Sequence, residues 1–283
     1  MVNGRDCVIA IGTVPVPYAE ETIREAVAAL IEQASIEGDG VCRGIQKNCG
    51  VTGCIVTPLT IGTAPLLLGL ALGEAGIPVF VSETRNLYRR ELRLVPYEDG
   101  ERFELCQERG ERGKRFEACG VSGFELRIHQ GEAVKLRLDI AGEHGGAPYP
   151  SEGGREFATG ERFKENGVSY TVNGRELREI YGLTIAAKKI GGTKTEVWIH
   201  RVLEESADIP QAIEKLEVTA RLYRDRYEQG NQGSGNLGLF RLRLSRLVMM
   251  SDETAVDAAD AVIGPLRYYC AGDFTAEVFS EGN

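Results

Sequence analysis

Residues Gly123–Glu143 read GFELRIHQGEAVKLRLDIAGE, and this stretch decides the fold class. Apolar and polar residues alternate in its first half, and after a turn at Gly131 the alternation resumes. A period of two is typical of antiparallel strands with one buried face and one face in water. The stretch therefore predicts a β-hairpin over 123–141 with Leu136 on its buried face. The charged positions predicted to point outward are Glu125, Arg127, Lys135, Arg137 and Asp139.

Composition limits the classes of function. The chain has 283 residues, with 42 acidic and 33 basic side chains and a formal charge of -9. It lacks the basic excess with which nucleic-acid-binding proteins neutralise phosphates, so tight binding of DNA or RNA is not expected. The length suits one large domain or two ordinary lobes, of which we favour two.

No segment predicts a leader or a membrane span. The apolar run at the N-terminus is short, and the most apolar stretch, 64–73, covers about half of a bilayer. We therefore expect a protein made in the cytoplasm. The seven cysteines are scattered through a large chain, which favours free thiols over a disulfide framework.

The first half mixes helical and extended patterns. Apolar residues at helical spacing, with acidic residues in the first turn, predict an amphipathic helix over 19–33. A short buried helix is expected from Thr63 to Leu72, closed by Gly73. A buried strand is expected over 78–82.

The charged stretch CQERGERGKRFEAC, Cys106–Cys119, has little apolar anchor apart from Phe116. We expect an exposed, mobile loop available to a partner, and the alternative is a solvated hairpin arm. The residues of this candidate loop are Glu108, Arg109, Arg112, Lys114, Arg115 and Glu117.

Glycine, proline and serine interrupt every apolar pattern over 142–154. This composition predicts a boundary there between two lobes, which comprise residues 1–145 and 155–283. The second lobe is β-rich, with Asn-Gly turn signals at Asn166 and Asn173. The pattern predicts strands over 168–172, 183–187, 195–201, 216–222, 239–248 and 274–279, a helical turn over 210–215, and a helix or loop over 252–261. The likeness of FELRI at 124–128 to FRLRL at 240–244 suggests internal duplication as a hypothesis.

No pattern indicates catalysis. The three histidines, His129, His144 and His200, have no partner at a spacing typical of a metal site or an activated nucleophile. Alternation around Trp198 places His200 on the outer side of its strand. We therefore predict a surface or interface role for His200.

Metal and nucleotide sites are not predicted either. The spacing C-x6-C-x4-C at 42–54 lacks the short pairs and the fourth ligand of a zinc site. The prolines in TVPVPY, 13–18, disrupt the glycine-rich turn that a dinucleotide fold requires, and GNQGSGNLG, 230–238, has no P-loop lysine. We interpret 230–238 as a hairpin tip and expect no metal and no cofactor.

Several segments together resemble a known family. They are SIEGD (35–39), GVTGCI (50–55), PLLLGLALG, LRLVPYEDGERFEL, the hairpin with its preceding CGVS, GTKTEVWIHRVL (192–203), the strand from Leu239, and VDAADAVIGPLRYYCAGDFTAEVF (256–279). In this order they resemble the tail tube protein, or major tail protein, of tailed bacteriophages, which is related in fold to type VI secretion tube proteins. The resemblance covers most of the chain and is one of arrangement.

The resemblance implies a mainly β (α+β) protein with a β-sandwich or barrel-like core and a flanking helix. It implies a structural virion protein, not an enzyme, whose rings stack into a conduit for DNA ejection. Its partners would be copies of itself, in hexameric or trimeric pseudo-hexameric rings, and other tail proteins. DNA would pass through without tight binding, along a wall that an acidic chain could line. The site of action would be the virion tail.

The roles of the charged residues follow from the same resemblance. The loop at 108–117 would contact the next ring, and the outward hairpin residues would form the wall or neighbour contacts. Two other classes stay open. One is a cytoplasmic α/β enzyme with Cys7 or Cys54 as nucleophile, and the other is a β-sandwich baseplate or adhesion module.

Overall fold

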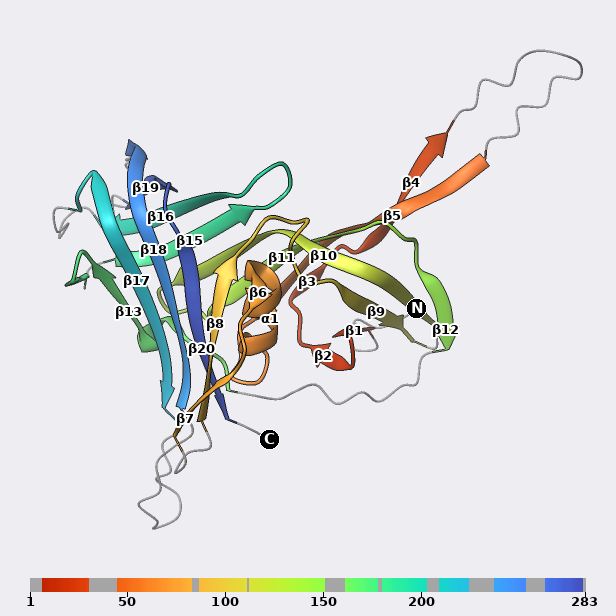
Figure 1. Cartoon of the computed structure of the whole chain (residues 1–283), viewed down its shortest axis with the longest axis horizontal. Helices are drawn as coiled ribbons and strands as arrows, with labels where there is room; N and C mark the ends of the chain where they lie inside the picture. The colour runs from red at the N-terminus through yellow and green to blue at the C-terminus, as the bar shows by residue number, and fades with distance from the viewer. Residues whose placement is uncertain are drawn as a thin grey trace, which may run out of the picture.

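The computed structural model describes residues 7–30, 45–82, 87–110, 112–150, 161–177, 180–202, 209–223, 237–252 and 263–281. This part of the chain is mainly β, as predicted, with one α-helix against a large antiparallel sheet (Figure 1). The first ten strands are β1 Cys7–Ile11, β2 Val14–Val16, β3 Glu20–Glu21, β4 Arg24–Leu30, β5 Ile45–Pro58, β6 Gly73–Ala75, β7 Val79–Ser82, β8 Leu87–Leu94, β9 Phe103–Arg109 and β10 Arg112–His129. The others are β11 Lys135–Gly142, β12 Ala147–Pro150, β13 Val168–Val172, β14 Arg175–Leu177, β15 Ile180–Lys188, β16 Lys194–Val202, β17 Ala212–Tyr223, β18 Leu237–Asp252, β19 Ile263–Cys270 and β20 Phe274–Glu281, with helix α1 Ala64–Leu72 and the 3-10 turn η2 Glu165–Gly167.

Two layers of strands enclose the core. One layer has the order β5–β11–β10–β15–β16–β19, and the other has the order β14–β13–β17–β18–β20–β8, with β6 and β7 on the outer side of β8. Strand β18 belongs to both, because its first half pairs with β20 and its second half pairs with β19. Figure 1 shows the two sets of strands crossing steeply. Phe124 of β10 packs on Phe274 of β20 between them, with ring centroids 6.0 Å apart.

A smaller group of strands extends the first layer. The first half of β10 pairs with β9 on one side and β12 on the other, and β1 and β2 follow beyond β9. This group lies on the right in Figure 1, near the N-terminus. Phe116 fills its interior because the alternation of β10 turns this side chain inward.

The hairpin predicted over 123–141 is confirmed. Strands β10 and β11 pair in the register Leu126 to Leu136 and Phe124 to Leu138, and these side chains are buried. The polar side chains between them point away from the core, as predicted. Burial of one apolar face stabilises such a ribbon, at about 25 cal/mol per Å² of apolar surface removed from water.

The buried helix is also confirmed. Helix α1 begins after Thr63 and ends at Gly73, whose φ of 93° places it in the left-handed region that glycine adopts readily. Most of its side chains are buried, and the helix contacts β8, β10 and β20. The Nζ of the buried Lys189 lies 3.4 Å from the carbonyl oxygen of Ala71 and donates to this last turn of the helix.

The predicted helix over 19–33 is wrong. Residues 20–21 form β3 and 24–30 form β4, and both pair with β5, while 31–33 lie outside the described residues. Helix propensity is a weak preference, and the backbone pairs offered by β5 override it here. Gly53 of β5 permits the approach, since a Cβ at this position would lie 2.5 Å from the carbonyl oxygen of Thr22.

Several smaller predictions need correction. The strand predicted over 78–82 exists as β7, but it is exposed because it lies at the edge of its layer. The predicted helical turn over 210–215 is wrong, since β17 already begins at Ala212. The segment 252–261 lies almost wholly outside the described residues.

The two Asn-Gly signals have different outcomes. Asn173 and Gly174, with φ of 49° and 81°, form the predicted tight turn between β13 and β14. Asn166 lies in η2, where no hairpin forms. The predicted tip at 230–238 lies mostly outside the described residues, and the strands on either side of it pair from Tyr223 and Leu237 onward.

Strand pairing continues across the predicted lobe boundary. Strand β10, from the first predicted lobe, pairs with β15, from the second, over seven residue pairs. The buried cluster likewise draws its side chains from both halves of the chain. Within the segment 142–154, residues 147–150 form β12.

Candidate functional site

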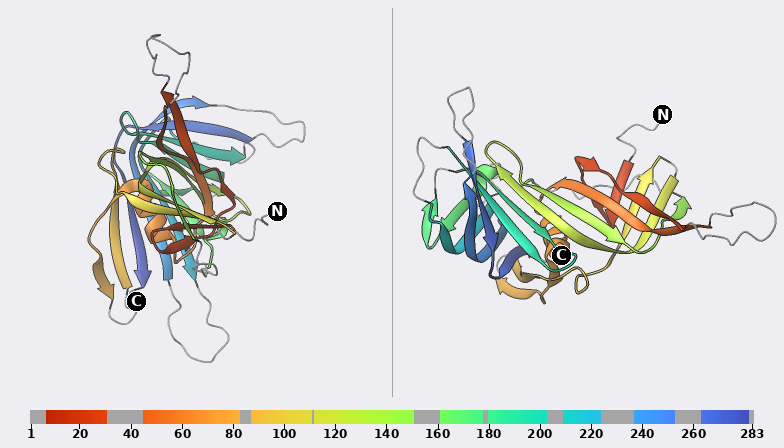
Figure 2. Two further views of the ribbon diagram at one scale, coloured as in Figure 1. Left: turned by 90° about the vertical axis from the view of Figure 1, so that its right-hand side faces the viewer. Right: turned by 90° about the horizontal axis from the view of Figure 1, so that it is seen from above.

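A two-stranded arm projects from the body. The second half of β5 pairs with β11 in the body, whereas its first half pairs with β4. Figures 1 and 2 show β4 and the start of β5 leaving the body together. An isolated two-stranded ribbon is marginally stable in water and has unpaired backbone groups along both outer edges. The arm is therefore suited to contact another chain.

The candidate loop over 106–119 is a hairpin at the root of this arm. Strands β9 and β10 pair through it, in the register Cys106 to Arg115, so the prediction of a loop is wrong and the alternative of a hairpin arm is right. Five of the six predicted residues are exposed, but Glu108 is buried. The hydroxyl of Tyr149 donates to the Glu108 carboxylate over 2.7 Å. Burial and this hydrogen bond raise the pKa of Tyr149.

Three of the exposed charges form ion pairs within the chain. Arg109 pairs with Glu21 over 3.1 Å and Lys114 pairs with Glu25 over 3.2 Å. Both acids lie on the segment that enters the arm, so these pairs help to hold its base in place. Arg115 pairs with Glu104 over 3.4 Å.

The five predicted wall residues lie on the outer face of β10 and β11, as expected from the alternation. Arg127 pairs with Glu125, and Arg137 pairs with Asp139 over 2.9 Å. Lys135 pairs with Glu132 over 2.7 Å. Four of the five, together with Ala19, Glu20 and Val56, line a hollow of about 130 Å³. With three basic and two acidic side chains, these five do not make an acidic wall.

A second charged face, not predicted from the sequence, covers β17, β18, β20 and β8. Arg241 and Arg243 of β18 lie between Glu217 of β17 and Glu277 of β20. Arg243 contacts Glu217 at 3.2 Å and Glu277 at 3.0 Å, and Arg241 contacts them at 3.5 and 3.1 Å. Burial opposes ionisation of Glu217, but hydrogen bonds from Lys215 and Arg243 outweigh it and lower its pKa. Such a network fixes the spacing of the strands.

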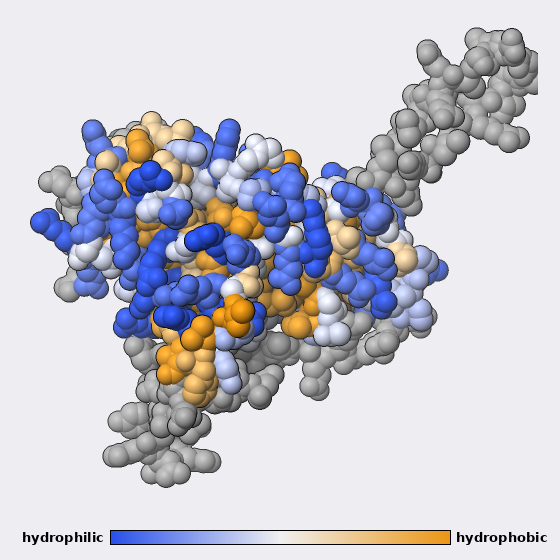
Figure 3. All heavy atoms as spheres, viewed as in Figure 1, coloured by the Kyte–Doolittle hydropathy of each residue, from blue (hydrophilic) through white to orange (hydrophobic). Residues whose placement is uncertain are grey.

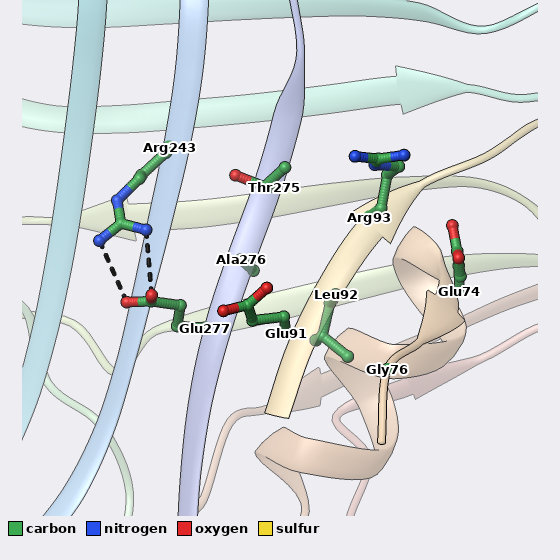
Figure 4. A pocket seen from close by; sticks show the side chains of 9 residues that line it. All are labelled: Glu74, Gly76, Glu91, Leu92, Arg93, Arg243, Thr275, Ala276 and Glu277. Carbon is green, nitrogen blue, oxygen red and sulfur yellow. Dashed lines mark hydrogen bonds and ion pairs between the residues drawn. The ribbon is translucent and has the colours of Figure 1, made fainter. Parts of the chain in front are cut away.

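Beside this network lies a hollow of about 350 Å³ (Figure 4). Figure 4 shows Arg243 joined to Glu277 on one side, with Arg93 and Glu74 on the other. The hollow is lined by Glu74, Gly76, Glu91, Leu92, Arg93, Arg243, Thr275, Ala276 and Glu277. Three carboxylates against two guanidinium groups leave it close to neutral, and no pair of groups is placed as a nucleophile and its base.

Two of the histidines meet on the outer face of the first layer. His129 of β10 and His200 of β16 both lie opposite Gly182 of β15, and their ring centroids are 5.0 Å apart. Each Nε2 lies 3.3 Å from the Oγ1 of Thr184. Burial lowers the pKa of both imidazoles. The outward direction predicted for His200 is confirmed, whereas the contact with His129 depends on a strand register that was not predicted.

The cysteine proposed as a nucleophile at position 54 is buried, and its Sγ lies 3.4 Å from the hydroxyl of Thr22. Within the described ranges, no three histidine, cysteine or acidic side chains gather as metal ligands. The same part of the chain contains no helix that is long and apolar enough to cross a membrane. His144 lies on an exposed bend after β11, at the end of this strand that pairs with Gly120, whereas His129 lies nine residues further along β10.

Comparison with protein-family models gives no match, and comparison with curated proteins gives none either.

Proposed function

We propose that the chain is a structural subunit of a bacteriophage tail tube, which assembles into rings that stack into a conduit for DNA. The arm formed by β4 and β5 carries this proposal. Among the described residues, β4 pairs only with β5, and residues 45–48 of β5 pair only with β4. The outer edges of the arm are therefore available to a neighbouring subunit. A repeating assembly would satisfy such edges in every copy.

The charged faces support an assembly role. The faces on β10–β11 and on β17–β18–β20 carry side chains of both signs in ion pairs, which limits net attraction to phosphates. For the first face, this balance favours contacts with a neighbouring copy over an acidic lining of the conduit. The exposed charges of the β9–β10 hairpin, chiefly Arg112, Lys114 and Arg115, are the proposed contacts to the next ring.

A shortened arm tests this proposal. Replacing residues 27–48 by an Asn-Gly turn joins β4 to β5 close to the body and leaves the pairing of β5 with β11 intact. We expect the variant to keep its β-type circular dichroism and cooperative unfolding but to form no rings or tubes by negative-stain electron microscopy. Tubes of ordinary length from a folded, arm-shortened variant would contradict the proposal.

Charge reversal of Arg112, Lys114 and Arg115 is the companion experiment. These side chains are exposed, so the fold should persist while stacking of rings weakens. Arg112→Glu alone leaves the ion pairs of Lys114 with Glu25 and of Arg115 with Glu104 intact, so it separates loss of stacking from loosening of the arm base. The expected result is shorter tubes at a given protein concentration. Unchanged tube length would remove the stacking role from this hairpin.

A further inference from the structure

One edge of the second layer bears an apolar tongue, residues 76–81. Ile77 is 86% exposed, and Val79, Phe80 and Val81 are each close to half exposed. None of these residues carries a charge. Figure 3 shows the apolar surface gathered at this lower end of the body.

The tongue is exposed on both of its faces. Val79, Phe80 and Val81 are consecutive in β7, so they point alternately to opposite sides, yet all are exposed. Among the described strands, β7 pairs only with β8. Soluble proteins usually protect a free edge strand with charges or prolines inside it, and β7 itself, Val79–Ser82, contains neither. Such an apolar edge indicates an interaction site.

A second apolar surface lies on β18 and β19. Val248 and Met250 are each more than half exposed, and Tyr269 lies opposite Val248 in the strand register. Beside them is an open hollow of about 500 Å³. Its lining, all of it uncharged, consists of Gln211, Ala212, Val248, Met249, Met250 and Ser251.

The tongue and this hollow lie at opposite ends of the second layer. The strand register places Val79 level with Arg89, Phe279 and Leu239. Val248 lies nine residues further along β18 than Leu239. At about 3.3 Å per residue, the two surfaces are roughly 30 Å apart along the strand. Figure 1 shows β7 at the lower end of these strands and β19 at their upper end.

We propose that the tongue of one copy seats in the hollow at Val248 and Met250 of the next copy. The inference rests on the proposed function and specifies one of its contacts. The occupant is a second copy because this chain supplies both surfaces, and both are uncharged, whereas the sheet face between them, on β8, β20 and β18, is covered with ion pairs. Two different patches at opposite ends join copies head to tail, which gives a ring if the rotation closes and a filament if it does not.

Two charge substitutions test this contact. Phe80→Asp alters the tongue, together with the contact of the Phe80 ring with Tyr88 of β8, and Met250→Asp alters the hollow. Ile190→Asp is the matched control, because Ile190 is an exposed apolar residue outside both surfaces. Each variant is compared with the wild-type chain by analytical ultracentrifugation and electron microscopy, alone and in an equimolar mixture.

Phe80→Asp and Met250→Asp should each need at least a tenfold higher protein concentration than the wild type to assemble. Ile190→Asp should assemble at the same concentration as the wild type. Mixing the two defective variants should restore one contact per pair, since one copy keeps its tongue and the other its hollow. The mixture should therefore yield a 1:1 heterodimer that grows no further.

Other outcomes overturn the inference in distinguishable ways. Normal assembly of both variants would overturn the contact while leaving the tube proposal standing. If each variant loses assembly and the mixture forms no heterodimer, the head-to-tail contact is wrong and the two surfaces act in another geometry. A wild-type chain that stays monomeric at every concentration would overturn both the contact and the proposed function.

Discussion

Replacement of the buried Lys189 by methionine should change how stability depends on pH. The side chain is 1% exposed and donates to the carbonyl oxygen of Ala71. Among the described residues, no carboxylate forms an ion pair with it. Burial, assisted by the nearby charge of Arg102, lowers the pKa of Lys189 from 10.5 to about 8. Lys189→Met removes this titration and keeps a side chain of similar length.

The magnitude follows from proton linkage. The folded chain releases the proton of Lys189 at lower pH than the unfolded chain, so between about pH 8 and 10.5 the unfolded state binds more protons. Stability contributed by this group therefore rises with pH. At 1.36 kcal/mol per pKa unit, the full effect is about 3 kcal/mol, of which about 1 kcal/mol develops between pH 7 and pH 9.

Urea unfolding at pH 7, 8 and 9, followed by circular dichroism, measures this effect. The free energy of unfolding of the wild type should rise relative to Lys189→Met by about 1 kcal/mol across this range. Other titrating groups are common to both proteins and cancel in the difference. Lys188→Met is the control, because Lys188 is the exposed neighbour of Lys189 in the sequence. A constant difference for Lys189→Met would refute the assigned environment.

Three further predictions concern the fold. Leu136→Asp should abolish folding by placing an unpaired charge in the core, whereas Arg137→Asp on the outer face should leave a folded protein, which circular dichroism would distinguish. Thermal stability should fall as pH drops from 7 to 5, because burial lowers the pKa of His129 and His200, so the unfolded chain binds more protons than the folded chain in this range. His129→Gln should reduce the dependence of the unfolding temperature on pH in calorimetric scans. Gly53→Ala should lower the unfolding free energy by more than about 1 kcal/mol in urea titrations, since its φ of 146° and the close backbone of Thr22 and Ile23 leave no room for a methyl group.

Local alternation predicted the strands whose burial is one-sided. The β10–β11 hairpin and the buried helix could be predicted because Leu136 and Gly73 follow simple rules of facing and capping. The helix predicted over 19–33 failed because alanine and glutamate favour helices locally, whereas its partners on strand β5 lie 15 to 36 residues further along the chain. Strand β19 was not predicted, although Leu266 and Tyr268 are buried at alternate positions within it.

Sites formed across strands were harder to predict. The outward arginines of FRLRL were visible in the sequence, but their partners Glu217 and Glu277 come from strands whose register the sequence does not reveal. The contact between His129 and His200 likewise requires both to flank Gly182. Of the lysine pair at 188–189, Lys189 is the buried member because it continues the buried alternation of Ile185 and Ala187 and packs on α1.

Negative-stain electron microscopy of the concentrated wild-type chain tests the central claim most directly. The tube proposal predicts rings of uniform diameter that stack into tubes, with length increasing with protein concentration. If the arm serves assembly, these particles should be absent from the variant in which 27–48 is replaced by a turn. Discrete monomers or trimers without axial stacking at every concentration would contradict the claim and favour a baseplate or adhesion module.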